Sequence, residues 1–219
     1  MSLWHYLRRR WPAFLLSIIL AAGQAVVMNI LHWQPIWLLP LLYVLFLMLS
    51  IGFYDPELKR ARRLDRWFAQ LFIFLMVLAN LISLGLLLWG SFGPTATIPA
   101  LDLLIAGAAL WLVNMLTFGL VFWEIDGGGP ERRQSSQTNY PDLLFPQQTL
   151  DVQLQLAPAD WRPQLLDYLY TSLTAAIAFS PTDTMPLTRR LKVLMGAENL
   201  ISFVVFALLI ARAVNLISS

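Results

Sequence analysis

Residues 11–54 read WPAFLLSIILAAGQAVVMNILHWQPIWLLPLLYVLFLMLSIGFY, a stretch without a single Asp, Glu, Lys or Arg. A helix rises 1.5 Å per residue, so about 20 apolar residues cross the roughly 30 Å hydrocarbon core of a bilayer. The break at His32–Pro35 divides the stretch into two segments of that length, and proline suits the first turn of a helix. The stretch therefore predicts a membrane hairpin of two helices, about 12–31 and 35–53.

The same pattern continues downstream. Residues 54–66 are rich in charge and are expected to form a loop. The uncharged run 67–101 that follows is broken at residues 91–94 and predicts a helix of about 67–90 and the start of another of about 99–123. Near the end of the chain, 191–216 is long and apolar enough for a further full span.

The composition agrees with a membrane protein. Of the 219 residues, 58% are hydrophobic and 13% are charged, whereas soluble domains carry about 25% charged residues. This balance excludes a soluble enzyme, a nucleic-acid-binding module and a disordered tail. The chain has no cysteine, so thiolate nucleophiles and thiolate metal sites are excluded. No His and carboxylate cluster has the spacing of a metal site. We expect no metal, no cofactor and no enzymatic activity.

A polar segment, 124–162, separates the fourth predicted helix from the last third of the chain. Within it Leu150, Val152, Leu154 and Leu156 alternate with polar residues, which predicts one short strand. The strand either pairs with its copy in a neighbouring subunit or lies on the membrane surface. The segment is also a candidate surface for a protein partner.

The basic residues predict the orientation. With the N-terminus in the cytoplasm, the Arg residues at 8–10 and the basic residues at 59–66 both lie inside, and the two short intervening loops contain no Lys or Arg. The polar segment is then cytoplasmic too. This pattern predicts an integral membrane protein with its N-terminus in the cytoplasm. We expect its location to be the bacterial inner (plasma) membrane.

Residues 164–180 allow two topologies. If they dip into the membrane and return, all of the 15 basic residues except Arg212 are cytoplasmic, and Arg212 can extend to the opposite surface. If they cross, Arg189, Arg190 and Lys192 lie outside, against the positive-inside rule. The segment is short, and Asp167 would cost about 2.5–3.5 kcal/mol in hydrocarbon. We expect an all-α polytopic protein with five transmembrane helices and a re-entrant helix; six transmembrane helices are the alternative.

The expected organisation has three parts. Residues 1–123 form a four-helix transmembrane region, 124–162 a polar cytoplasmic segment, and 163–219 a pore-like module of short helix, SPTD loop and last transmembrane helix.

The last part resembles the pore helix, filter and inner helix of two-transmembrane potassium-channel modules over about 50 of the 219 residues. Those modules combine Tyr-x-Ser-x-x-Thr-Thr, a glycine-rich filter, Asp-x-x-Pro-x-Thr, an Arg and a closing Ile-Ala-Arg. The matching residues are Tyr170, Ser172, Thr174, Asp183, Pro186, Thr188, Arg189 or Arg190, and Ile210–Arg212. The chain also resembles uncharacterised bacterial membrane proteins that carry the stretch FSPTDTMPLTRR, a similarity that implies no activity.

Two features depart from the potassium-channel pattern. Potassium selectivity needs a ring of backbone carbonyls from a glycine-containing loop, but residues 176–180 read AIAFS. The selectivity therefore does not carry over. In addition, the channel filter faces outward, whereas the distribution of basic residues places this loop on the cytoplasmic side.

The resemblance implies an ion path in a homo-oligomer, with a tetramer favoured. The candidate pore or ion-binding residues are Thr171, Ser172, Thr174, Ser180, Thr182, Asp183 and Glu198. The candidate gate or structural polar residues are Asp167, Asn199 and Arg212. A carboxylate inside a span, such as Glu198, is by default a functional candidate; alternatively, Glu198 caps the short helix or bonds Thr and Ser hydroxyls. Asp183 either coordinates a cation or makes a turn.

Three functions fit these residues. The first is a channel-like protein that passes or binds a small cation. The second is a non-conducting scaffold or regulator in which the same module is a packed core. The third is a small secondary transporter, whose site would lie within one subunit.

Overall fold

The structure, a computed structural model, describes residues 3–33, 41, 59–92, 98–133, 140–150, 158, 161–179 and 183–218. Outside the described residues lie the predicted second helix apart from Leu41, nearly all of the predicted strand 150–156, Ser180 and Thr182.

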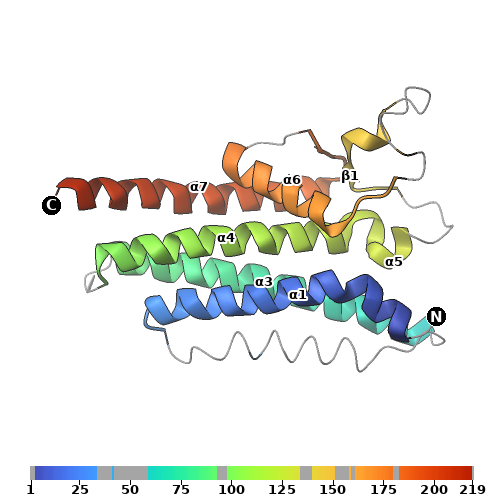
Figure 1. Cartoon of the computed structure of the whole chain (residues 1–219), viewed down its shortest axis with the longest axis horizontal. Helices are drawn as coiled ribbons and strands as arrows, with labels where there is room; N and C mark the ends of the chain where they lie inside the picture. Colours follow the sequence, from blue (N-terminus) through green and yellow to red (C-terminus); the bar gives the residue numbers. More distant parts are fainter. Residues whose placement is uncertain are drawn as a thin grey trace. The chain divides into compact units, whose positions relative to one another are not determined.

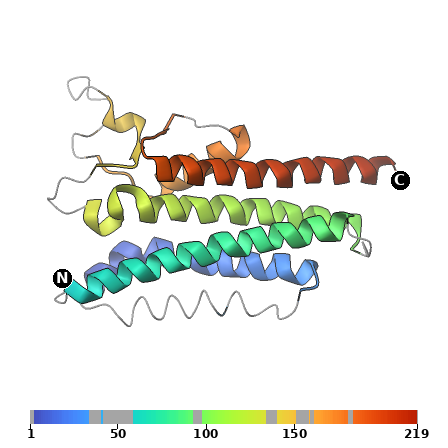
Figure 2. The same cartoon turned by 180° about the vertical axis from the view of Figure 1, so that it is seen from behind.

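Helices dominate the described residues (Figures 1 and 2). In chain order the elements are α1 (Leu3–Ile30), α3 (Lys59–Phe92), α4 (Ala100–Ile125), η1 (Asp126–Gly128), α5 (Pro130–Arg133), β1 (Leu143–Leu144), η2 (Pro146–Gln148), α6 (Leu165–Ala178), β2 (Met185–Pro186) and α7 (Arg189–Ser218). Four helices, α1, α3, α4 and α7, contain segments that are long and apolar enough to cross a membrane. These helices indicate a membrane-embedded protein.

The segment 54–66 is not simply a loop, as its charge predicted. Helix α3 already begins at Lys59, so residues 59–66 are helical. This part of the sequence, KRARRLDR, consists largely of residues with high helix propensity. The apolar part of α3 that could cross a membrane begins only at Phe74. The predicted start, residue 67, thus lies between the start of the helix and the start of its apolar span.

The chain divides into two compact units whose boundaries fall inside α4 and α7. Unit 1 comprises residues 1–117 and 204–219, and unit 2 comprises residues 118–203. Within unit 1, buried amides connect neighbouring helices. The side-chain amide of Gln24 in α1 donates to the hydroxyl of Ser83 in α3 and to the Ala79 carbonyl oxygen at 3.2 Å.

Close helix packing in unit 1 depends on glycine. A Cβ at Gly107 in α4 would lie 2.8 Å from Cδ2 of Leu209 in α7.

The same unit holds a second interhelical amide contact, from Asn80 Nδ2 to Asn114 Oδ1 at 3.4 Å. Polar groups inside a bundle are expected to bond across helices, and Gln24, Asn80 and Asn114 do so.

In unit 2 the residues on both sides of α6 connect to the residues that follow α4. Near the start of α6 the Tyr168 hydroxyl donates to Asp126, directly after α4, at 2.6 Å. After α6 the Leu187 backbone N–H donates to the Asp142 carbonyl oxygen at 2.8 Å, and the backbone N–H of Asp142 itself donates to Asp126. The 14 residues of α6 measure about 21 Å at 1.5 Å per residue, less than the membrane core.

A two-stranded antiparallel ladder closes this arrangement. Strand β1 pairs with β2, with Leu143 opposite Pro186 and Leu144 opposite Met185. The ladder connects the polar segment to the stretch just before α7. The alternating pattern of the sequence predicted a strand only further along the polar segment, because two-residue strands have no periodicity to detect.

Candidate functional site

One face of helix α6 is buried within unit 2. Its backbone begins after Gln164, whose N–H donates to Oδ2 of Asp167 at 2.7 Å. It ends at Phe179, which adopts the left-handed conformation with φ 54°. The buried side chains follow the three- and four-residue spacing of one helix face: Tyr168, Thr171, Ser172, Ala175 and Ala176. Three hydroxyl groups, of Tyr168, Thr171 and Ser172, therefore lie inside the packed unit.

Glu198 lies on the buried face of α7. The buried residues on this face are Leu191, Met195, Glu198, Ser202 and Val205. The hydroxyl of Ser172 donates to Oε1 of Glu198 and joins the two helices. A carboxylate in apolar surroundings is costly without such polar partners. The Ser172–Glu198 pair is the central feature of the candidate site.

Polar contacts flank this pair on both helices. The side-chain amide of Asn199 lies 3.1 Å from the Ala175 carbonyl oxygen and 3.2 Å from that of Met195, and it donates to both. On the other side, the hydroxyl oxygens of Thr171 and Thr184 lie 3.3 Å apart. The structure therefore brings Thr171, Ser172, Glu198 and Asn199 to one interface between α6 and α7.

Two other candidates lie outside this interface. Thr174 is partly exposed, and its hydroxyl donates within α6 to the Tyr170 carbonyl oxygen at 2.9 Å. Asp183 is exposed, and its Oδ1 lies 3.4 Å from the Thr184 hydroxyl. Neither residue contributes to the Ser172–Glu198 pair.

Asp167 and Arg212 have structural partners. Asp167 caps the start of α6 by accepting the Gln164 backbone N–H, and a carboxylate is favourable at a helix N-terminus. In unit 1 the Arg212 guanidinium donates to the Ser91 carbonyl oxygen in the last turn of α3 and lies 5.9 Å from the centre of the Phe92 ring. A basic side chain at a helix C-terminus satisfies carbonyls that lack helical partners.

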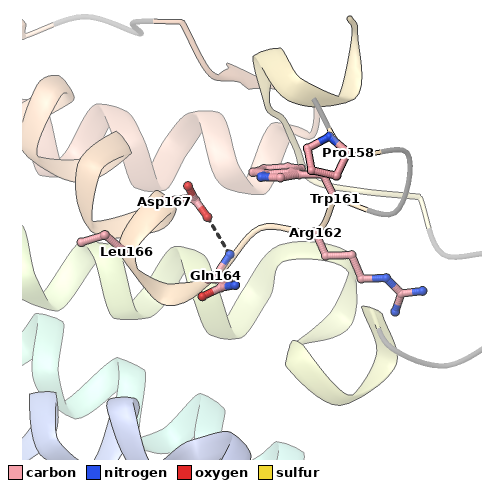
Figure 3. A pocket seen from close by; sticks show the side chains of 6 residues that line it. All are labelled: Pro158, Trp161, Arg162, Gln164, Leu166 and Asp167. Carbon is pink, nitrogen blue, oxygen red and sulfur yellow. Dashed lines mark hydrogen bonds between the residues drawn. The ribbon is translucent and has the colours of Figure 1, made fainter. Parts of the chain in front are cut away.

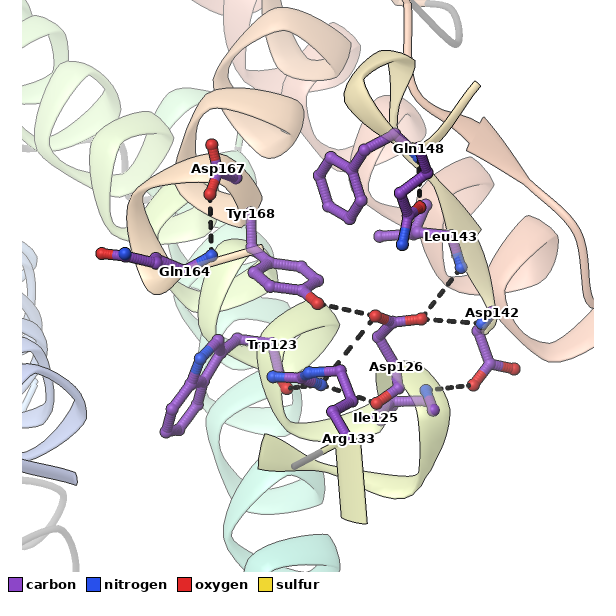
Figure 4. A network of polar contacts seen from close by, with 12 residues as sticks. Trp123, Ile125, Asp126, Arg133, Asp142, Leu143, Gln148, Gln164, Asp167 and Tyr168 are labelled. Carbon is purple, nitrogen blue, oxygen red and sulfur yellow. Dashed lines mark hydrogen bonds and ion pairs between the residues drawn. The ribbon is translucent and has the colours of Figure 1, made fainter. Parts of the chain in front are cut away.

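Beside the start of α6 is a polar cap, which we define as residues 126–133, 140–150 and 183–188. Figure 4 shows Asp126 at its centre. Oδ1 of Asp126 accepts the backbone N–H groups of Asp142 (2.7 Å) and Leu143 (3.0 Å). Oδ2 accepts the Tyr168 hydroxyl and lies 3.9 Å from the Arg133 guanidinium. One buried carboxylate thus ties the end of α4 to β1 and α6.

Asp142 forms the second centre of the polar cap. It accepts the Thr188 hydroxyl at 2.7 Å, the backbone N–H of Gly127 at 3.1 Å and the Arg190 guanidinium at 2.5 Å. Burial by itself would raise the pKa of Asp142, but the hydrogen bonds from Arg190 and Thr188 and the charge of Arg190 outweigh it and lower the pKa below its ordinary value.

Asp126 and Asp142 were not among the functional residues predicted from the sequence. Both acids lie in or beside a polar segment, where a carboxylate is usually solvated. A usable signal was the position of Asp126 directly after an apolar span and before three consecutive glycines, all three of which adopt positive φ. That arrangement reverses the chain at the helix end and turns the carboxylate inward.

Comparison with known proteins identifies no relative: no family model matches the chain, and no curated protein and no solved structure is detectably similar to it. The function must therefore be argued from the residues themselves.

Proposed function

We propose that the chain is an ion-channel-like membrane protein that binds or passes a small cation through α6 and α7 and works as a homo-oligomer. The observation that carries the proposal is the Ser172–Glu198 pair, buried on facing sides of a short helix and a long apolar helix. A carboxylate in apolar surroundings strongly favours a positive species, whether a proton or a metal cation. Hydroxyl oxygens are suitable further ligands for a hard cation.

The course of the chain around α6 supports a re-entrant helix. The first turns of α6 bond to Asp126, and Leu187 bonds to Asp142 in the same polar cap. Helix α6 is also too short to cross the hydrocarbon core. A helix that enters and returns on one side needs protein or water around it. Neighbouring subunits in a ring, four of them by resemblance to channel modules, would supply that surrounding.

The exposed candidates fit the same proposal. Asp183 is exposed and Thr174 partly exposed, so both can face a path that several subunits form together. Re-entry of α6 leaves Arg189, Arg190 and Lys192 on the side of the polar cap. The positive-inside rule then makes that side, with the N-terminus, cytoplasmic.

The test begins with the mass of the assembly in lipid nanodiscs, followed by cation flux in liposomes. A ring of several subunits with flux of protons, sodium or potassium is expected. Glu198→Gln keeps an oxygen that can accept from Ser172 but removes the charge, and it should reduce flux at least tenfold. Asp102→Asn in the first turn of α4 is the matched control and should conduct normally. A monomer, or flux that is indifferent to Glu198, would overturn the proposal.

A non-conducting scaffold is the second candidate. It is favoured by the complete burial of Ser172 and Glu198 within one chain, which is the environment of a packing contact. In that case the wild-type protein shows no flux, and Glu198→Gln changes only the stability of the protein. The polar cap would then be the functional surface, and deletions within it would abolish partner binding.

A further inference from the structure

A cavity of about 630 Å³ opens at the start of α6, at a distance along the helix from the Ser172–Glu198 pair. Its lining residues, shown in Figure 3, are Pro158, Trp161, Arg162, Gln164, Leu166 and Asp167. Its volume is within the range of small-molecule sites. The lining includes one cation, one carboxylate and one indole, a combination that the proposed ion path does not use.

The cavity lies at the level where the apolar helices begin and end, which is the expected level of the membrane boundary. Helix α6 starts beside the polar cap, where α4 ends at Ile125 and α7 begins at Arg189. Tryptophan and arginine are typical of the level of the lipid headgroups. Leu166, at the rim, is 75% exposed, and Tyr170 one turn further along α6 is 54% exposed. An apolar strip thus leads from the cavity along α6.

The two charged groups are held apart. In Figure 3 the Arg162 side chain extends to one side of Gln164 and the Asp167 carboxylate to the other. The Arg162 guanidinium is exposed and lies 3.4 Å from the Arg133 carbonyl oxygen, so it retains donors for an anion. Asp167 Oδ2 accepts the Gln164 N–H, and a carboxylate has further lone pairs for a second donor.

We propose that this cavity binds the headgroup of a zwitterionic aminophospholipid, phosphatidylethanolamine in type. The phosphate would contact Arg162, the ammonium would donate to Asp167, and an acyl chain would follow Leu166 and Tyr170. The carboxylate of Asp167 disfavours a purely anionic headgroup. A choline headgroup lacks the N–H groups that Asp167 can accept. The inference is independent of the proposed ion path.

Native mass spectrometry of the purified full-length chain can test this, with phosphatidylethanolamine, phosphatidylcholine and phosphatidylglycerol of identical acyl chains. Phosphatidylethanolamine should be retained best. Arg162→Gln and Asp167→Asn should each weaken its retention roughly tenfold, the size expected for one charge-assisted hydrogen bond. The Asn side chain can still accept the Gln164 N–H, so α6 keeps its start. Arg189→Gln, at an exposed arginine of the same unit, is the matched control and should bind like the wild type.

Three results would overturn the proposal. The first is equal retention of the three lipids. The second is loss of binding in Arg162→Gln but not in Asp167→Asn, which would indicate an anionic lipid held by charge alone. The third is binding of glycerophosphoethanolamine, which has the same headgroup without acyl chains, as tightly as the lipid, which would indicate a soluble ligand.

Discussion

Asp142 shows how much a single residue contributes to the polar cap. Its carboxylate accepts hydrogen bonds from Gly127, Thr188 and Arg190, which come from two separate parts of unit 2, the turn after α4 and the start of α7. The charge of Arg190 adds little by itself, because its side chain is 58% exposed and solvent screens it. The geometry of the acceptor is the larger contribution, since removing a buried acceptor costs about 1–3 kcal/mol.

The lowered pKa of Asp142 predicts a pH dependence of stability. The folded-state pKa lies below the ordinary value of 3.8, so the carboxylate stabilises the fold above about pH 4. This contribution disappears as the pH falls through the lower folded-state pKa. Asp142→Asn should therefore lower the apparent melting temperature at pH 7, and the difference from the wild type should shrink at pH 3.

Melting curves of the purified protein at several pH values provide the measurement. Asp183→Asn removes the same charge from an exposed position and should show no comparable change with pH. A difference between wild type and Asp142→Asn that stays constant from pH 7 to pH 3 would contradict the assigned role.

At the residue scale, the sequence indicated some site residues and concealed others. Glu198 could be found because a carboxylate within an apolar run is conspicuous, and the predicted alternative of bonding to a Ser hydroxyl is what the structure contains. Asp126 was harder to find: its position between an apolar span and three glycines is a local signal, but its burial depends on Tyr168 and on backbone groups of β1, which are distant in the sequence. Local pattern does not encode such long-range partners.

At the scale of elements, α6 depends on a close approach to α4. A Cβ at Gly119 of α4 would lie 2.6 Å from Leu169 Cδ2 and 3.0 Å from the Leu169 Cα atom. The backbone contact leaves little room to adjust, and overpacking costs about 1–3 kcal/mol. Gly119→Ala should lower the melting temperature of the protein.

Gly196 in α7 is the matched control for that substitution. A Cβ there would meet nothing within 4 Å, so Gly196→Ala should leave stability unchanged or raise it by up to about 1 kcal/mol through helix propensity. Equal effects of the two substitutions in thermal unfolding would mean that α6 does not depend on contact with Gly119.

The helices were the most predictable elements. Long apolar runs predicted helices of about 99–123 and 191–216, and the structure has α4 at Ala100–Ile125 and α7 at Arg189–Ser218. Apolar length is a strong signal because a bilayer imposes it. The start of α3 and the β1–β2 ladder were missed. The part of α3 that precedes its apolar span is helical because of residue helix propensity, which hydropathy does not measure. Strands β1 and β2 form because each pairs with the other, and the two are distant in sequence.

At the scale of the whole molecule, the topology can be tested with single cysteines, because the chain has none of its own. If α6 re-enters, Asp183→Cys should react with a membrane-impermeant maleimide from the same side as Arg132→Cys in the polar cap. Phe92→Cys, at the exposed end of α3 that precedes α4, should react from the opposite side. Labelling of intact cells of the expression host measures the accessibility of each cysteine from outside. Labelling of inverted membrane vesicles measures its accessibility from the cytoplasmic side.

The labelling pattern distinguishes the two topologies because they differ only after α6. A crossing α6 would place Asp183 with Phe92, and the basic residues at the start of α7 would then be outside, against the positive-inside rule. It would also require the bonds from Leu187 and Arg190 to Asp142 to break, since Asp142 belongs to the same cap as Arg132. Labelling of Asp183→Cys together with Phe92→Cys would therefore remove the basis for a re-entrant helix and, with it, the shared path in the proposed oligomer.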